Sequence, residues 1–193
     1  MKILLLHAHP DAESFNGALH QLALQQLRAN GHEVDNCDLY AERFDPCLSR
    51  QERLAYHDES VNLDPVRHYV ERLKRAEAIV MCYPVWNFGY PAILKGYFDR
   101  VFLPGISFKL VEGRVVPNLQ HISKVAVITT YGGPRWRAFV LGDPPRKLVK
   151  RVLRVQIRPR APVYYLAHYD MNRSTPQTRA EFLAAVEKRL RRF

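Results

Sequence analysis

The sequence predicts an α/β fold, a three-layer sandwich in which helices cover both faces of an open parallel sheet. Two observations predict it. Short apolar runs alternate with helix-like patterns along the chain, and the runs that begin at Lys2, Ala78 and Lys124 are apolar almost throughout. Strands of a parallel sheet are buried on both faces, so they appear as continuous apolar runs. The first, third and fourth strands are the most apolar and belong at the centre, which gives the order 2-1-3-4-5.

Local signals place the elements in the first half of the chain. Asn30-Gly31 ends the first helix, Ser49 and Glu52 form a capping box, and Asp64 before Pro65 starts a further helix. The expected elements are a strand at Lys2–His7, a helix at Asn16–Asn30, a polar edge strand at Glu33–Leu39, a short helix after Ser49 and a helix at Pro65–Ala76.

The second half repeats the same alternation of strand and helix. Its expected elements are a strand at Ala78–Tyr83, a helix at Pro91–Phe102, a strand at Lys124–Thr130, an amphipathic helix at Lys147–Val155, a strand at Ala161–Ala167 and a closing helix at Thr175–Arg192.

Length and composition indicate one globular domain spanning residues 1–193. Hydrophobic residues make up 47% of the chain and charged residues 25%, as in ordinary globular proteins. No apolar run approaches the roughly 20 residues needed to cross a bilayer, and the run at 3–6 is too short for a secretory signal. Cys37, Cys47 and Cys82 are odd in number and lack CxxC spacing, which favours free thiols and a cytoplasmic location.

Three polar and aromatic segments each follow one of the apolar runs: residues 9–16, 83–89 and 129–133. Ligands of open α/β sheets bind outside the carboxyl ends of the strands. The three segments therefore predict one pocket, suited to a flat ring with polar edges and a phosphate tail.

The first segment allows two interpretations. Ser14-Phe15-Asn16 precedes a helix, whose unpaired N–H groups and dipole attract a phosphate, with His9 as a further donor. The alternative is that Ser14 or Asn16 only caps the helix. His7 and His9 also form an HxH pair, but no second His pair accompanies it, so no metal is expected.

The other two segments complete the expected pocket. Residues 83–90 are dense in aromatic side chains, which suits the wall of a ligand site, although a hydrophobic plug or a dimer contact is the alternative. Thr129 and Thr130 supply hydroxyls, and Gly132-Gly133 allows the backbone to approach a ligand closely.

Taken together, three motifs resemble the NAD(P)H:quinone oxidoreductases of the flavodoxin-like fold, the group that includes DT-diaphorase, the modulator-of-drug-activity proteins and the potassium-efflux ancillary oxidoreductases. The motifs are Ser14-Phe15-Asn16, the stretch from Pro84 through Pro91-Ala92-Ile93-Leu94-Lys95-Gly96 to Phe102, and Thr129-Thr130-Tyr131-Gly132-Gly133. The resemblance covers most of the chain, and the helix at Pro91–Phe102 is its most specific part.

The resemblance implies a flavin, FAD or FMN with a preference for FAD, that takes a hydride from NADH or NADPH and passes two electrons to a quinone-like acceptor. It also implies a homodimer. The residues that would contact the flavin are His9, Ser14, Phe15, Asn16, Pro84, Val85, Trp86, Asn87, Phe88, Thr129, Thr130, Gly132 and Gly133.

The sequence departs from the family after the third segment. DT-diaphorase-like members carry a Tyr and a His there, which stabilise charge on the reduced ring and relay a proton. Residues 134–145 contain no His, so Tyr131 is the catalytic candidate, with Arg135 or Arg137 as a candidate to balance charge. A mobile lid is the alternative interpretation of residues 134–145.

The formal net charge is +10, and cations are dense between Arg146 and Arg160. A solvated helix face, contact with an anionic membrane surface and attraction of nucleotide phosphates are the three interpretations of this basic segment. No nucleic-acid motif accompanies it, so no nucleic-acid partner is expected.

Two alternative functions stay open at this point. One is a zinc hydrolase, because Ala8-His9-Pro10-Asp11-Ala12-Glu13 partly matches an AHPDDE signature, but Ala12 replaces the second acid and no HxxH follows. The other is a flavin-binding regulatory subunit of a membrane transporter.

Overall fold

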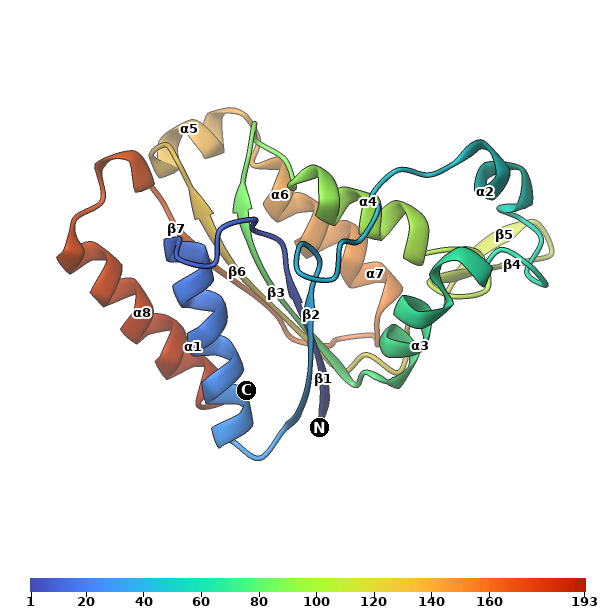
Figure 1. Cartoon of the computed structure of the whole chain (residues 1–193), viewed down its shortest axis with the longest axis horizontal. Coiled ribbons are helices and arrows are strands. Elements are labelled where there is room, and N and C mark those ends of the chain that lie inside the picture. Colours follow the sequence, from blue (N-terminus) through green and yellow to red (C-terminus); the bar gives the residue numbers. More distant parts are fainter.

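The computed structural model describes all 193 residues and has a five-stranded parallel sheet at its centre, in the order β2-β1-β3-β6-β7 (Figure 1). Its strands are β1 (Lys2–His7), β2 (Glu33–Asp38), β3 (Ala78–Val85), β6 (Lys124–Tyr131) and β7 (Val163–His168). This order confirms the prediction 2-1-3-4-5 once the strands of the central sheet alone are numbered.

Helices cover both faces of the sheet (Figure 1). The helical elements are α1 (Phe15–Ala29), α2 (Arg50–Ala55), the 3-10 turn η1 (Asp64–Val66), α3 (Arg67–Arg75), α4 (Ala92–Val101), α5 (Arg135–Val140), α6 (Pro144–Lys147), the π-helical stretch η2 (Leu148–Leu153), α7 (Arg154–Gln156), the 3-10 turn η3 (Met171–Arg173) and α8 (Pro176–Leu190). In Figure 1, α1 and α8 lie side by side on one face, and α3, α4 and α6–α7 lie on the other.

Alternate residues of each central strand serve two separate cores. On the α1/α8 face, Leu5, Val80 and Ile128 belong to a cluster of 14 buried residues. On the opposite face, Leu6 and Met81 belong to a cluster of 29. A strand buried on both faces must be apolar throughout, which is the pattern that the sequence shows.

Several boundaries differ from the sequence prediction. The helix expected from Pro65 begins as the 3-10 turn η1 and becomes α3 only at Arg67, because Val66 has φ −129°, outside the helical region. Strand β7 begins at Val163, directly after Pro162, a residue without an N–H to donate to a ladder. The basic helix runs from Pro144 to Gln156 and is π-helical over its middle six residues.

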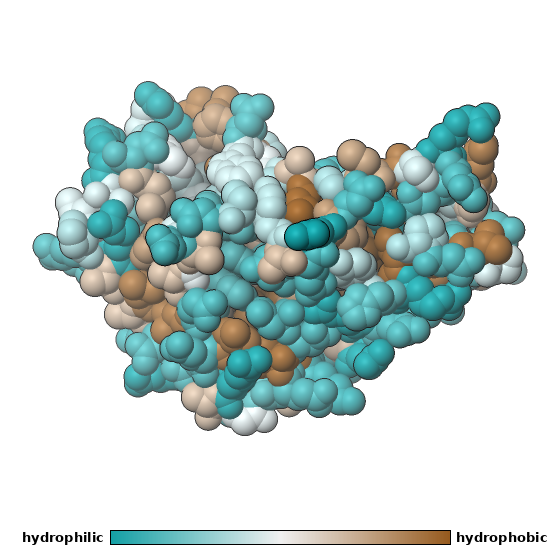
Figure 2. All heavy atoms as spheres, viewed as in Figure 1, coloured by the Kyte–Doolittle hydropathy of each residue, from teal (hydrophilic) through white to brown (hydrophobic).

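Strands β4 (Phe108–Val111) and β5 (Arg114–Pro117) form a β-hairpin that was not predicted from the sequence, a separate two-stranded sheet beside α2 (Figure 1). Its side chains Leu110, Val111, Val115 and Val116 are exposed. In Figure 2, hydrophobic atoms also reach the surface at the outer end of α5, where Trp136, Phe139, Val140 and Leu141 are exposed. No helix of the structure has the length and apolar character that crossing a membrane requires.

Candidate functional site

The three predicted segments follow β1, β3 and β6, the three central strands, so they meet at the carboxyl edge of the sheet. The His9 and Trp86 rings lie 5.7 Å apart between centroids, which joins the first segment to the second. Val85, Asn87 and Phe88 line one cavity with residues 131–134, which joins the second segment to the third. The structure therefore brings the three segments together as predicted.

In the first segment, Ser14 is the N-cap of α1. Its Oγ accepts the Gly17 N–H at 3.0 Å, donates to the Asp11 carbonyl at 2.7 Å and lies 3.1 Å from the His9 Nδ1. Gly17 is required here, because a Cβ at this position would overlap the Ala12 carbonyl. The capping interpretation therefore holds for Ser14, and the loop is fixed against the helix.

Two backbone donors remain beside that cap. The N–H groups of Phe15 and Asn16 have no acceptor within the chain. The Phe15 ring packs away from the second segment, 5.6 Å from the His168 ring and 6.4 Å from the Phe182 ring. Phe15 can therefore offer its backbone N–H to a ligand, while its side chain belongs to the interface between α1 and α8.

Asn16 is the clearest sign of a ligand at this helix end. The residue is only 3% exposed, and neither its Oδ1 nor its Nδ2 has a hydrogen-bond partner. A buried amide without partners costs about 1–3 kcal/mol, so such groups in folded proteins are nearly always satisfied. A phosphate oxygen of a ligand held at the start of α1 would accept from the Nδ2, and the Oδ1 would need a donor such as a ligand hydroxyl.

The second segment is a tight turn. The N–H groups of Trp86 and Gly89 each donate to the other residue's carbonyl, at 3.3 and 2.9 Å. Asn87 and Phe88 between them have φ of 49° and 56°, a conformation uncommon for residues other than glycine. Their N–H groups have no acceptor within the chain. Two strained residues with free donors at a strand end are typical of a binding site.

The ends of β3 and β6 support this turn. Pro84 is buried and pairs in register with Thr130. The Thr129 hydroxyl donates to the Tyr83 carbonyl at 2.6 Å and is fully buried, so Thr129 ties the two strands together. Thr130 is also buried, on the opposite face of the sheet.

In the third segment, the carbonyls of Gly132 and Gly133 accept hydrogen bonds from the N–H groups of Asn172 and Asp170, at 3.1 and 2.8 Å. Their own N–H groups have no acceptor within the chain. Both glycines line the cavity shared with the second segment, whose volume is about 160 Å³. Hydrogen bonds to residues 170 and 172 therefore fix the glycine backbone, and the two glycine N–H groups are left available for a ligand in this cavity.

The Tyr131 ring lines the same cavity, but its hydroxyl points elsewhere. It donates to the Asp143 Oδ1 at 2.6 Å and lies 2.7 Å from the Tyr165 hydroxyl. The ring stacks on Tyr169, 4.6 Å between centroids. Burial, together with Tyr165 and Asp143, raises the pKa of Tyr131. The phenol therefore keeps its proton and shares it in the hydrogen bond to Asp143.

The partners of Tyr131 in the structure, Asp143, Tyr165 and Tyr169, were not predicted from the sequence. The Gly142-Asp143-Pro144 turn was visible in the sequence, and Asp143 takes a left-handed conformation with φ 45°. Nothing local indicated that its carboxylate would meet a tyrosine on β6, because that contact depends on how the chain returns to the sheet.

The residues present fit a flavin. A planar ring with polar edges requires backbone donors and apolar faces, and its phosphate tail requires a helix N-terminus. Free N–H groups at residues 87–88 and 132–133, the exposed rings of Trp86 and Phe88, and the unpartnered Asn16 amide at the start of α1 supply these features.

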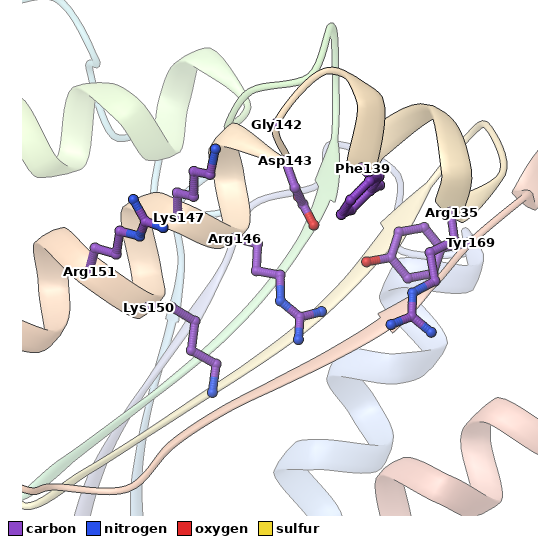
Figure 3. A pocket seen from close by; sticks show the side chains of 9 residues that line it. All are labelled: Arg135, Phe139, Gly142, Asp143, Arg146, Lys147, Lys150, Arg151 and Tyr169. Atoms are coloured by element: carbon purple, nitrogen blue, oxygen red, sulfur yellow. The ribbon is translucent and has the colours of Figure 1, made fainter.

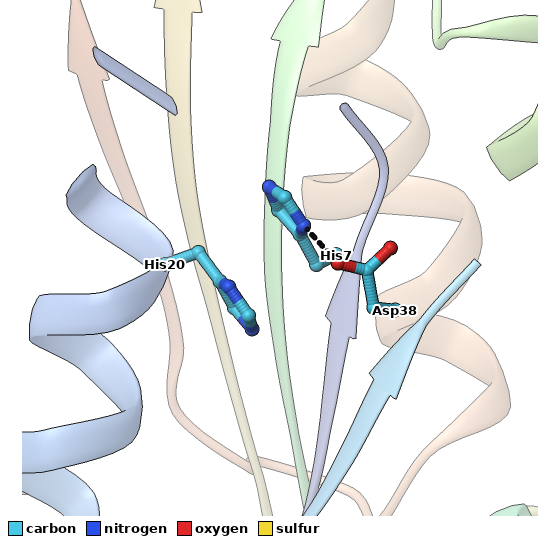
Figure 4. Close-up of side chains that lie close together, drawn as sticks. All are labelled: His7, His20 and Asp38. Carbon is cyan, nitrogen blue, oxygen red and sulfur yellow. Dashed lines mark hydrogen bonds and ion pairs between the residues drawn. The ribbon is translucent and has the colours of Figure 1, made fainter. Parts of the chain in front are cut away.

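The two histidines of the HxH pair, His7 and His9, have different surroundings in the structure. His7 is buried, with its Nδ1 3.0 Å from the Asp38 Oδ2, whereas His9 belongs to the first segment (Figure 4). His7, His20 and Asp38 have candidate ligand atoms within 4.8 Å of one another. The two imidazoles lie 4.1 Å apart and 6° from parallel, so their in-plane lone pairs do not converge on one point. This geometry does not suit a metal centre.

Comparisons with known proteins agree with the fold. NAD(P)H dehydrogenase (quinone) 1 of Cavia porcellus is 28% identical over 214 residues, which cover 98% of this chain and 76% of that protein. A ribosyldihydronicotinamide dehydrogenase-like protein of Penicillium crustosum is 36% identical over 128 residues, 58% of this chain. The chain spans about half of that fungal relative, 48% of its length.

Among solved structures, an NAD(P)H:quinone oxidoreductase from Methanothermobacter marburgensis superimposes with a TM-score of 0.82 at 26% identity, covering 99% of this chain and 98% of that one. The family model described as a flavodoxin-like fold matches residues 1–190. The chain therefore belongs to the flavodoxin-like family.

Proposed function

We propose that this chain is a flavin-dependent NAD(P)H oxidoreductase that passes two electrons to a quinone or a similar small acceptor. The observation that carries the proposal is the buried, unpartnered Asn16 amide at the start of α1. It lies at the same edge of the sheet as the second and third segments, whose backbone N–H groups at residues 87–88 and 132–133 have no acceptor within the chain. The named activities of the relatives support the same reaction class.

When bound, the flavin supplies the redox chemistry, accepting a hydride and passing on two electrons. The protein's own residues bind and orient it. The Asn16 side-chain amide and the N–H groups of Phe15 and Asn16 would hold the phosphate end at the positive end of the α1 dipole. His9 holds Ser14 and Asp11 in place and so fixes the loop that surrounds this end.

The ring system would lie between the second and third segments. The N–H groups of Asn87, Phe88, Gly132 and Gly133, which have no acceptor within the chain, would donate to its polar edge. Trp86 and Phe88 offer exposed aromatic faces for packing, and Val85 adds an apolar wall. Because the turn at residues 86–89 is closed by its own hydrogen bonds, these donors are positioned before any ligand arrives.

Tyr131 is the residue of this chain proposed to move a proton. Its hydroxyl donates to the Asp143 carboxylate. Once Asp143 has taken a proton from solvent, Tyr131 could release its own proton toward the site and take the proton of Asp143 in return, so that the phenol stays neutral. Arg137 lines the same cavity and places a positive charge near the ring. This arrangement stands where relatives of the DT-diaphorase type use a Tyr and a His.

A homodimer forms part of the proposal. An apolar groove of about 230 Å³ runs between α4 and η2, lined by Tyr90, Phe98, Phe102, Leu148 and Val152 among others. A second copy of the chain that covers this groove would remove its apolar surface from water. Sedimentation of the protein should give a dimer, and Val152→Glu should give a monomer.

The cofactor is proposed to be FAD, and the location cytoplasmic.

The direct test is to purify the protein, add FAD or FMN, and follow the visible spectrum anaerobically. The protein should be yellow and should bleach when NADH or NADPH is added, and chromatography of the released flavin identifies it. A protein that takes up neither flavin, measured by equilibrium dialysis, would overturn the proposal. Uptake of flavin with no bleaching by either nucleotide would favour the regulatory subunit instead.

A further inference from the structure

A second cavity, of about 350 Å³, lies beside α5 and the basic helix. Arg135 and Phe139 of α5 line this cavity, whereas Arg137 and Ala138 of the same helix line the cavity between the second and third segments. Five of its side chains are cationic and one is a carboxylate: Arg135, Arg146, Lys147, Lys150 and Arg151, with Asp143. We call it the basic cavity.

None of these five cations is in an ion pair. Buried arginines elsewhere in the chain are paired, Arg72 with Asp35 and Glu42, and Arg100 with Glu52. The carboxylate of Asp143 accepts the Tyr131 hydroxyl instead. The basic cavity therefore holds five positive charges against the single carboxylate of Asp143, which forms an ion pair with none of them.

The neighbouring positive charges affect the protonation of Lys150. Its ammonium donates to the Val163 carbonyl, and its pKa is lowered by burial and then by Arg146 and Arg154. An anion in the cavity would offset this repulsion, because opposite charge within a few ångströms favours the charged form.

The shape of the cavity suits a phosphate. In Figure 3, the side chains of Arg135 and Arg146 extend beside the Tyr169 ring, and those of Lys147 and Arg151 extend from another side of the helix. A guanidinium presents two parallel donors that match two phosphate oxygens. Phe139 and Tyr169 add aromatic surface of the kind that packs against a nucleotide.

The position of the cavity connects it to the flavin site. Tyr131, the last residue of β6, contributes to the first cavity and bonds Asp143, which lines the second. Tyr169 directly follows β7 and stacks on Tyr131. Both cavities thus lie at the carboxyl edge of the sheet, where a dinucleotide could reach from one to the other.

We propose that the basic cavity binds the 2′-phosphate of NADPH, so that this chain prefers NADPH to NADH. The inference rests on the proposed function for its choice of nucleotide. The chemistry recognised is a phosphate monoester, which anionic lipid headgroups also carry, so the experiment includes both sources.

The primary test is calorimetric titration of the purified protein with 2′,5′-ADP and with 5′-AMP, two probes that differ in the 2′-phosphate. The 2′,5′-ADP should bind about tenfold or more tightly than 5′-AMP. The double variant Arg135→Gln with Arg146→Gln should lose that difference. The double variant Lys188→Gln with Arg192→Gln removes the same charge from exposed, unpaired positions at the C-terminal end and should keep it.

Equal binding of the two probes to the wild-type protein would overturn the proposal, whether or not the variants fold. So would cosedimentation with vesicles containing phosphatidic acid that is lost in the Arg135/Arg146 variant while neither probe binds, because the cavity would then be a headgroup site. Flavin uptake is measured separately on the same preparation. A protein that discriminates the probes but binds no flavin would keep the phosphate site and reject the proposed oxidoreductase.

For the flavin-loaded enzyme, the ratio of kcat/KM for NADPH to that for NADH should exceed one and should fall toward one in the Arg135/Arg146 variant. The loss should appear in the KM for NADPH, since the 2′-phosphate is remote from the hydride that is transferred. An unchanged ratio would contradict the inference.

Discussion

The imidazole rings of His7 and His20 lie face to face, 4.1 Å apart between centroids and 6° from parallel (Figure 4). His7 ends β1 and His20 lies on α1, so this contact is part of the packing of the first helix on the sheet. Burial lowers the pKa of both residues, and the proximity of His7 lowers that of His20 further. Two neutral rings can stack at this distance, whereas two charged rings repel each other.

This stack predicts that the protein loses stability in acid. In the unfolded chain each histidine titrates near its ordinary pKa of about 6.5, whereas in the folded chain both pKa values are lower. The unfolded state therefore binds more protons as the pH falls below about 6.5, and the free energy of unfolding decreases there. Urea unfolding at a series of pH values measures the slope. His20→Gln should flatten it, and His57→Gln, at an exposed position, should not. A wild-type free energy that stays constant down to about pH 5 would contradict the prediction.

Arg72 should be one of the most sensitive positions for stability. Its side chain is 9% exposed, and it pairs with Asp35 at 2.6 Å and with Glu42 at 2.7 Å, linking α3 to the edge strand β2. The two carboxylates that Arg72→Ala would leave behind are 43% and 27% exposed, so water compensates them in part and the cost stays below the roughly 3–5 kcal/mol of a fully buried pair. Arg72→Ala should lower the free energy of unfolding by about 2–3 kcal/mol.

The control for this prediction is Arg75→Ala, one turn along α3. That side chain is 69% exposed and pairs with Glu71 at 3.3 Å, so its loss should cost under about 1 kcal/mol. Equal losses for the two variants would show that the network around Arg72 contributes no more than a surface pair.

Asn16→Asp should weaken flavin binding. The substitution places a negative charge where the proposal puts the phosphate, and it keeps the size of the side chain. The dissociation constant for flavin, from fluorescence titration, should rise by about tenfold or more. Gln21→Glu adds the same charge to an exposed position of α1 and should leave the constant close to wild type. Unchanged affinity in Asn16→Asp would mean that the start of α1 does not hold the phosphate.

Tyr131→Phe tests the proton-transfer role. The variant removes the hydroxyl that donates to Asp143 at 2.6 Å and leaves the ring that stacks on Tyr169. If Tyr131 moves a proton, kcat should fall by about 10² or more while flavin stays bound. The matched variant Tyr164→Phe, on β7 and in contact with Arg189, should keep the wild-type kcat. Stopped-flow measurement of each half-reaction separates the two steps, and a wild-type kcat in Tyr131→Phe would reject the role.

How far the sequence predicts this molecule depends on the range of each interaction. The capping box of Ser49 and Glu52 was predicted and forms, because both of its hydrogen bonds join residues three apart. The sheet order was also predicted, because burial on both faces leaves a continuous apolar run in the sequence. The hairpin at residues 108–117 was missed, although Glu112-Gly113 between two apolar runs is a turn signal.

In the site, too, what could be predicted depends on the range of the interaction. The segments were located because strand ends converge in this kind of sheet, whichever side chains they carry. The orientation of individual side chains was not predictable. Whether the Phe15 ring packs on His168 or the Thr129 hydroxyl bonds the Tyr83 carbonyl depends on neighbours distant in sequence. Tyr131 and Asp143 are only twelve residues apart, yet the turn at Gly142, with φ 80°, decides their contact.

The hairpin of β4 and β5 has consequences for anyone who handles the protein in quantity. Beyond Phe108, whose carbonyl accepts the Gly105 N–H, no further strand pairs with the outer edges of this hairpin, and the side chains of its valines and of Leu110 are exposed. Such an edge can template further strands from other molecules, and Lys109 and Arg114 are the charges that oppose this. Concentrated samples should therefore become turbid sooner when either of these two charges is removed, and light scattering over time would show it.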